Sequence, residues 1–97
     1  MRYIGTFREG MHIADVYLCK NKQIALTKNG KEYGNLVMQD KTGTIDAKIW
    51  DLGSPGVGEF ETMDYVRVEA DVTLFQNSFQ LNVRRIRTAR EGEYVEA

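Results

Sequence analysis

The chain has 97 residues, enough for one small domain, because two separate cores would leave each half too short to bury sufficient surface. Its 42% hydrophobic and 28% charged residues are typical of a globular protein and exclude a disordered one. Thirteen Lys and Arg residues face fourteen Asp and Glu residues for a net charge of -1, so any attraction to nucleic acid must come from a local patch.

A single cysteine, Cys19, and a single histidine, His12, exclude an internal disulfide and the usual Cys/His metal cages. Both residues are interpreted as structural. The first residues lead quickly into Arg8 and Glu9 without an apolar stretch, and no segment is long enough for a membrane helix. We therefore expect a cytoplasmic protein with no membrane partner.

Apolar and polar residues alternate along most of the chain, which is typical of strands. Five strands are predicted, over residues 11–18, 33–40, 44–50, 65–75 and 79–83, with a basic connection over residues 20–31. Asp40-Lys41-Thr42-Gly43 predicts a tight hairpin turn between the second and third strands. Strand parity then points the following residues into the core: Leu36, Met38, Ile45, Ala47, Ile49, Val66, Val68, Phe79, Leu81 and Val83.

A short helix is predicted over residues 55–63, between the third and fourth strands. Ser54 suits an N-cap before Pro55, and Val57, Phe60 and Met63 recur at a spacing of three. Five strands with one short helix at this place are the order of an all-β OB-fold, a five-stranded Greek-key barrel. An SH3-like barrel is the alternative, although its helical turn lies between the last two strands. We expect the domain over residues 1–90 and a linker over 91–97.

Residues 36–51, with the sequence LVMQDKTGTIDAKIWD, resemble the second and third strands of nucleic-acid-binding OB domains grouped with tRNA-anticodon binders. Further matching motifs are Glu9-Gly10, Tyr17-Leu18, Lys28-Asn29-Gly30-Lys31 and Gln80-Leu81-Asn82-Val83. With these, the chain resembles the N-terminal domain of the YhaM-type 3′-to-5′ exoribonucleases of Gram-positive bacteria. The resemblance covers nearly every residue.

This resemblance implies that a downstream HD phosphohydrolase domain cuts the substrate and that the OB domain holds it. An HD site needs several His and Asp ligands, whereas this chain has one histidine, followed by Ile13. We therefore assign the chain no catalytic residue, metal ligand or cofactor, and expect the divalent metal, manganese, in the HD domain. The implied partners are single-stranded RNA or DNA and the HD domain of the same parent chain, and a homo-oligomer stays open as a further partner.

An OB-fold binds along its second and third strands, between two flanking loops. The candidate phosphate contacts beside the first loop are Lys20, Lys22, Lys28 and Lys31. The candidate contacts on the strands and beside the last loop are Tyr33, Asn35, Gln39, Lys48, Trp50, Phe75 and Asn77. Two alternatives stay open: the lysine-rich loop is a solvated loop, and Trp50 caps the barrel bottom against the short helix.

A second positive cluster, Arg84, Arg85, Arg87 and Arg90, has three interpretations. It extends a nucleic-acid track, it docks the downstream domain, or it is neutralised by Glu91, Glu93 and Glu96. The functional hypothesis is a non-catalytic module that binds single-stranded RNA or DNA. The alternative is a protein-interaction OB domain that mediates oligomerisation or docks the nuclease domain. A free-standing enzyme is disfavoured because no catalytic constellation occurs at a useful spacing.

Overall fold

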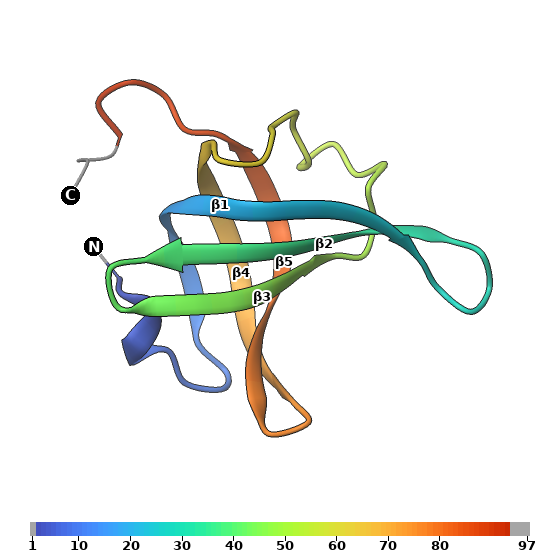
Figure 1. Cartoon of the computed structure of the whole chain (residues 1–97), viewed down its shortest axis with the longest axis horizontal. Coiled ribbons are helices and arrows are strands. Elements are labelled where there is room, and N and C mark those ends of the chain that lie inside the picture. The colour runs from blue at the N-terminus through green and yellow to red at the C-terminus, as the bar shows by residue number, and fades with distance from the viewer. Residues whose placement is uncertain (1, 94–97) are drawn as a thin grey trace.

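The computed structural model describes residues 2–93, so the end of the expected linker, residues 94–97, lies outside the described part. Five strands form a closed barrel (Figure 1) in the spatial order β1-β2-β3-β5-β4. All neighbours are antiparallel except β3 and β5. The elements are η1, one turn of 3-10 helix (Ile4–Thr6), β1 (His12–Leu26), β2 (Glu32–Asp40), β3 (Gly43–Ile49), β4 (Tyr65–Phe75) and β5 (Ser78–Thr88). The predicted all-β, five-stranded Greek-key barrel is confirmed.

Strand β1 is long enough to pair with two neighbours. Residues 12–18 pair with β4, residues 18–26 pair with β2, and the register shifts between Cys19 and Asn21. A bulge of this kind bends a strand, which allows β1 to turn around the barrel. The prediction that the first strand ends at residue 18 is therefore wrong. Residues 20–26 belong to a β1–β2 ribbon that projects from the barrel (Figure 1), and the connection shrinks to residues 27–31.

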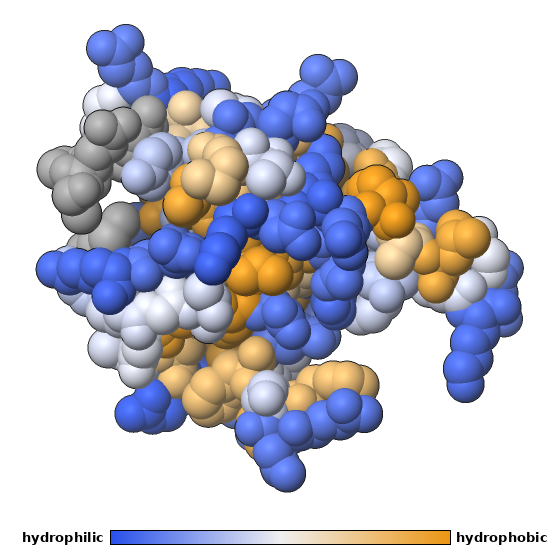
Figure 2. Space-filling view, in the orientation of Figure 1, coloured by the Kyte–Doolittle hydropathy of each residue, from blue (hydrophilic) through white to orange (hydrophobic). Residues whose placement is uncertain are grey.

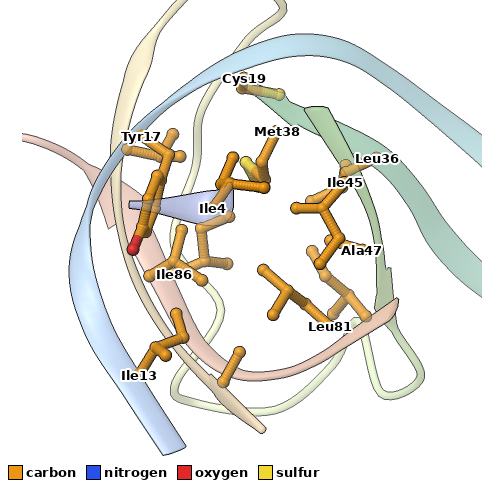
Figure 3. Packing of buried hydrophobic residues seen from close by; sticks show 14 of the residues in the cluster. Ile4, Ile13, Tyr17, Cys19, Leu36, Met38, Ile45, Ala47, Leu81 and Ile86 are labelled. Carbon is orange, nitrogen blue, oxygen red and sulfur yellow. The ribbon is translucent and has the colours of Figure 1, made fainter. Parts of the chain in front are cut away.

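The barrel interior is filled by the residues that strand parity points inward (Figure 3). Eight of the predicted core residues are buried: Leu36, Met38, Ile45, Ala47, Ile49, Val66, Val68 and Leu81. Val83 is partly buried against this cluster. The assignment of Phe79 to the core is wrong, since 37% of the residue is exposed. Phe79 pairs with Leu74 near the tip of the β4–β5 hairpin, where the inward parity continues but the barrel does not.

The N-terminal segment closes one end of the barrel. The Ile4 N–H donates to Asp40 Oδ2 at 2.7 Å, and the Gly5 N–H donates to Thr42 Oγ1 at 2.8 Å. Ile4 and the following Phe7 are buried. The turn predicted from Asp40 to Gly43 therefore connects two strands and also anchors η1 through its side chains.

The segment between β3 and β4 forms no helix, and the prediction for residues 55–63 is wrong. It instead runs parallel to β5: the Ile86 N–H donates to Gly56 O at 3.0 Å, and the Gly58 N–H donates to Ile86 O at 2.7 Å. A Cβ on Gly56 would lie 2.9 Å from Arg84 O. Glycine thus permits a close approach to β5, whose hydrogen bonds replace those of a helix. Within residues 2–93, no helix is long and apolar enough to cross a membrane.

Candidate nucleic-acid interface

Strands β2, β3 and β5 present one continuous outer face. Their register places Asn35, Lys48 and Asn82 in a row across the three strands. The Lys48 ammonium donates a hydrogen bond to Asn35 Oδ1, which fixes the lysine on this face. Because an ammonium has three donors, Lys48 keeps two for another acceptor such as a phosphate oxygen.

Trp50 lies directly after β3, two residues beyond Lys48 and beside Tyr33. Its ring lies against Tyr33, with 5.0 Å between ring centroids and 32° between planes. The indole Nε1–H donates to Asn82 Oδ1 at 3.1 Å. Two contacts from two other strands therefore fix the orientation of the indole, while 46% of the residue stays exposed. The helix that Trp50 was alternatively expected to cap is not formed.

The lysines predicted beside the first loop divide into two groups. Lys28 and Lys31 are exposed at the tip of the projecting β1–β2 ribbon, and Lys20 is exposed next to the bulge. The Lys22 Nζ instead donates to Phe60 O at 2.7 Å and lies 4.3 Å from the centroid of the Phe60 ring. Lys22 therefore packs on the segment that precedes β4, and its ammonium is engaged there.

The remaining predicted residues lie away from Trp50. Gln39 shares the outward parity of Asn35 but lies four residues along β2, about 13 Å away at the rise of an extended strand. Phe75 is 56% exposed near the tip of the β4–β5 hairpin. Asn77 forms the turn of that hairpin with Gln76, and both have positive φ. Asn77 thus satisfies a two-residue turn that needs this backbone conformation.

Sequence reasoning did not assign Asn82 to the site. Its outward parity follows from the inward parity of its neighbour Leu81. Its place beside Lys48 and Trp50 depends on the parallel pairing of β3 with β5, which joins residues more than 30 positions apart. Asp46, exposed on β3 between Val37 and Gln80, is a carboxylate on the same face. On β3 the positive charge of Lys48 therefore lies two residues from the negative charge of Asp46, on the side towards Trp50.

The arginines of the second positive cluster lie mostly in β5, which runs to Thr88 instead of ending at residue 83 as predicted. The Arg84 Nε donates to Asp71 Oδ2 at 2.6 Å, and His12 Nδ1 lies 2.9 Å from Asp71 Oδ1. These hydrogen bonds hold the pKa of Asp71 below its usual range; the bond with His12 contributes most, followed by the bond with Arg84. Arg87 donates to both carboxylate oxygens of Glu93, at 2.7 and 2.8 Å. Glu96, also expected to neutralise the cluster, lies outside the described residues.

Two other groups have no part in this interface. Cys19 is buried, and burial raises the pKa of its thiol, so it is a poor nucleophile. Tyr17 is buried in the core, where its hydroxyl donates to Arg2 O at 2.6 Å. Burial likewise raises the pKa of the Tyr17 phenol above its usual range. Cys19 and Tyr17 therefore fit structural roles, and for Cys19 this role was expected from the sequence.

Several solved protein structures share this barrel architecture. The second OB-fold domain of replication protein A from Methanococcus maripaludis matches with a TM-score of 0.67 and 17% identity, over 98% of each chain. The chain is an OB-fold domain. A replication protein A heterotrimer bound to single-stranded DNA matches with a TM-score of 0.67 and 22% identity, over 91% of this domain and 64% of that chain.

In sequence, the OB domain is similar to the 3′-5′ exoribonuclease YhaM of Geobacillus sp. (strain WCH70). The two are 38% identical over 82 residues, which cover 84% of this chain and 25% of that protein. No family model matches the chain. The resemblance to a YhaM-type OB domain is thus confirmed, and the domain spans a quarter of the length of that relative.

Proposed function

We propose that this OB domain is a non-catalytic module that binds single-stranded RNA or DNA across the outer face of β2, β3 and β5. The observation that carries the proposal is the half-exposed indole of Trp50, fixed in orientation by Tyr33 and Asn82. A fixed aromatic ring loses little conformational freedom when a base stacks on it, so most of the stacking energy is available for binding. The similar exoribonuclease and the neighbour bound to single-stranded DNA support this proposal.

In the proposed mechanism the domain binds the strand non-covalently and catalyses no reaction. Lys48 contacts a phosphate with its two remaining donors, while a neighbouring base stacks on Trp50. The amides of Asn35 and Asn82 are within the same row and offer hydrogen bonds to base edges. Lys20, Lys28 and Lys31 supply further positive charge along the projecting ribbon. Because stacking is available to every base, this site has little sequence preference.

Hydrolysis belongs, in this proposal, to another part of a longer parent chain, namely a downstream HD domain with a divalent metal, manganese. No three His, Cys, Asp or Glu side chains gather into a possible metal site among the described residues 2–93. In this division of labour the OB domain holds the strand and the HD domain cuts it.

A second candidate function is docking of the HD domain or of a second copy of the chain. The observation that favours it is the projecting β1–β2 ribbon, which carries apolar surface (Figure 2). On this ribbon Ile24 is 47% and Leu26 is 66% exposed. Apolar side chains at such a position suit a protein partner. An OB domain that sediments as a dimer and binds no oligonucleotide would favour this function over the first.

Titration of a labelled single strand at several salt concentrations tests the first proposal. If about 2–4 phosphates are contacted, log K falls against log salt with a slope of about -1.5 to -3, at about 0.7 per contact. We expect Lys48→Ala to reduce the size of this slope by about 0.7, because one phosphate contact is lost.

Lys41→Ala is the matched control for the lost charge. Lys41 lies in the β2–β3 turn, at the opposite end of these strands from Trp50, with its ammonium 4.8 Å from the centroid of the Tyr3 ring. We expect this variant to keep the slope of the unmodified chain. Equal slopes for the Lys48 and Lys41 variants would remove Lys48 from the interface.

A further inference from the structure

A pocket of about 370 Å³ opens on a different part of the barrel wall, between the segment 55–58 and the outer sides of β1, β4 and β5. Three arginines line it, Arg67, Arg85 and Arg87, and we call it the arginine pocket. The β4–β5 register shifts between Glu69 and Ala70, so that Arg84 has no partner in the ladder. This bulge places Arg85 and Arg87 outward on either side of the buried Ile86.

Two of the three arginines in the pocket form no side-chain hydrogen bond or ion pair with another residue of the described range 2–93. Arg87 is neutralised by Glu93, whose pKa is lowered to about 2 by the hydrogen bonds from Arg87 and from the Arg90 backbone, so this ion pair persists at neutral pH. Glu69 also lines the pocket, with a carboxylate oxygen 3.8 Å from His12 Nε2. Across the described residues 2–93, no side-chain hydrogen bond or ion pair engages Arg67 or Arg85.

The charges around the pocket leave a positive excess. The register sets Arg67 directly opposite Arg87, and like charges at such positions destabilise a sheet. The same register sets Glu69 opposite Arg85, so the unbalanced charge lies on the Arg67 and Arg87 pair. Three guanidinium groups face two carboxylates around the pocket, one from Glu69 and one from Glu93. A bound anion would offset the excess, and guanidinium groups suit phosphate oxygens because they offer paired donors in a plane.

The pocket wall is held by close backbone packing. A Cβ on Gly58 would lie 3.2 Å from Ile86 O, and one on Gly56 would lie 3.1 Å from Arg85 Cγ. Both glycines join β5 through hydrogen bonds with Ile86. The segment that forms this wall begins five residues after Trp50, and β5 carries Asn82 near its middle and Arg85 three residues later. Three residues of strand span about 10 Å, so the outer face and the arginine pocket are neighbouring sites.

We propose that the arginine pocket binds a backbone phosphate of the single strand after that strand has crossed the outer face at Trp50. This inference rests on the proposed function, because it assumes that the strand occupies that face. Arg67 and Arg85 supply the donors, since Arg84 and Arg87 are already paired with Asp71 and Glu93. The pocket thereby extends the footprint of the domain by the nucleotides beyond those held at Trp50.

Oligonucleotides of two lengths test the proposal with the 97-residue chain. A strand of about 4 nucleotides fills the outer face alone, and one of about 12 reaches the pocket, within the range of OB-fold site sizes. We expect the double variant Arg67→Gln/Arg85→Gln to bind the long strand roughly tenfold more weakly, with a salt slope reduced in size by about 0.7, because one phosphate contact is lost. The short strand should bind the double variant with the same affinity as the unmodified chain. Arg84→Gln, the matched control, should leave both affinities within about twofold.

The outcomes separate this inference from the proposed function. If the double variant binds the long strand normally while Trp50→Ala weakens both strands, the pocket proposal is overturned and the outer face stands; an acidic protein segment is then the better occupant. Equal losses for the short and long strands would also overturn it, because the arginines would not act beyond the face. If Trp50→Ala has no effect on either strand, the proposed function itself fails.

Discussion

Replacing Trp50 with alanine is expected to weaken the binding of single-stranded nucleic acid by about 1–3 kcal/mol, the usual contribution of one stacked base. The loss should be the same at every salt concentration, because a lost stack releases no counterions and leaves the salt slope unchanged. Fluorescence anisotropy of a labelled strand at three salt concentrations measures both quantities. Trp50 is half-exposed, so the variant should remain folded.

Trp50→Phe is the matched variant for this prediction. Phenylalanine keeps an aromatic face beside Tyr33 but loses the N–H donor to Asn82. We expect it to retain part of the affinity that alanine loses. If the Trp50→Ala and Trp50→Phe variants both bind the strand as tightly as the unmodified chain, no base stacks at this position.

Replacing Ile49 with alanine is expected to lower the free energy of unfolding by about 2–5 kcal/mol, a large part of the stability of a small domain. Ile49 is 1% exposed and packs directly over Gly34, where an added Cβ would lie 3.2 Å from the isoleucine Cβ. Truncation leaves a cavity that the surrounding barrel strands cannot close. Urea unfolding followed by circular dichroism measures the loss.

Asp46→Ala on the same strand is the control for Ile49→Ala. Asp46 points outward and is exposed, so its replacement should change the free energy of unfolding by no more than about 0.5 kcal/mol. Similar losses for the two variants would contradict the inward parity of Ile49 and therefore the register of β2 with β3.

The fold was predictable where the pattern is local. Alternation along β2 and β3 identifies both the strands and their buried side, because a shift of one residue would exchange core and surface. The same rule fails for Phe79, since parity alone does not show where the barrel ends. It also fails for residues 55–63, where spacing predicted a helix but hydrogen bonds to β5 determine an extended path.

The candidate site was predictable only in part, because its geometry depends on contacts between distant strands. Outward parity places Lys48 and Asn35 on one face, as expected from their positions in β2 and β3. The engagement of Lys22 by Phe60 depends on the path of the segment before β4, which the sequence pattern misassigned. Asn82 joins the face through the parallel β3–β5 pair, and no local signal specifies such a pairing.

The most direct test of the central claim is a nuclear magnetic resonance titration of the ¹⁵N-labelled chain with an unlabelled single strand. Trp50 is the chain's one tryptophan, so its indole N–H gives a single reporter signal on the outer face. We predict that this signal and the side-chain amides of Asn35 and Asn82 shift together as the strand is added. Unchanged signals for these three groups, while resonances of other residues move with the same titration, would contradict binding across β2, β3 and β5.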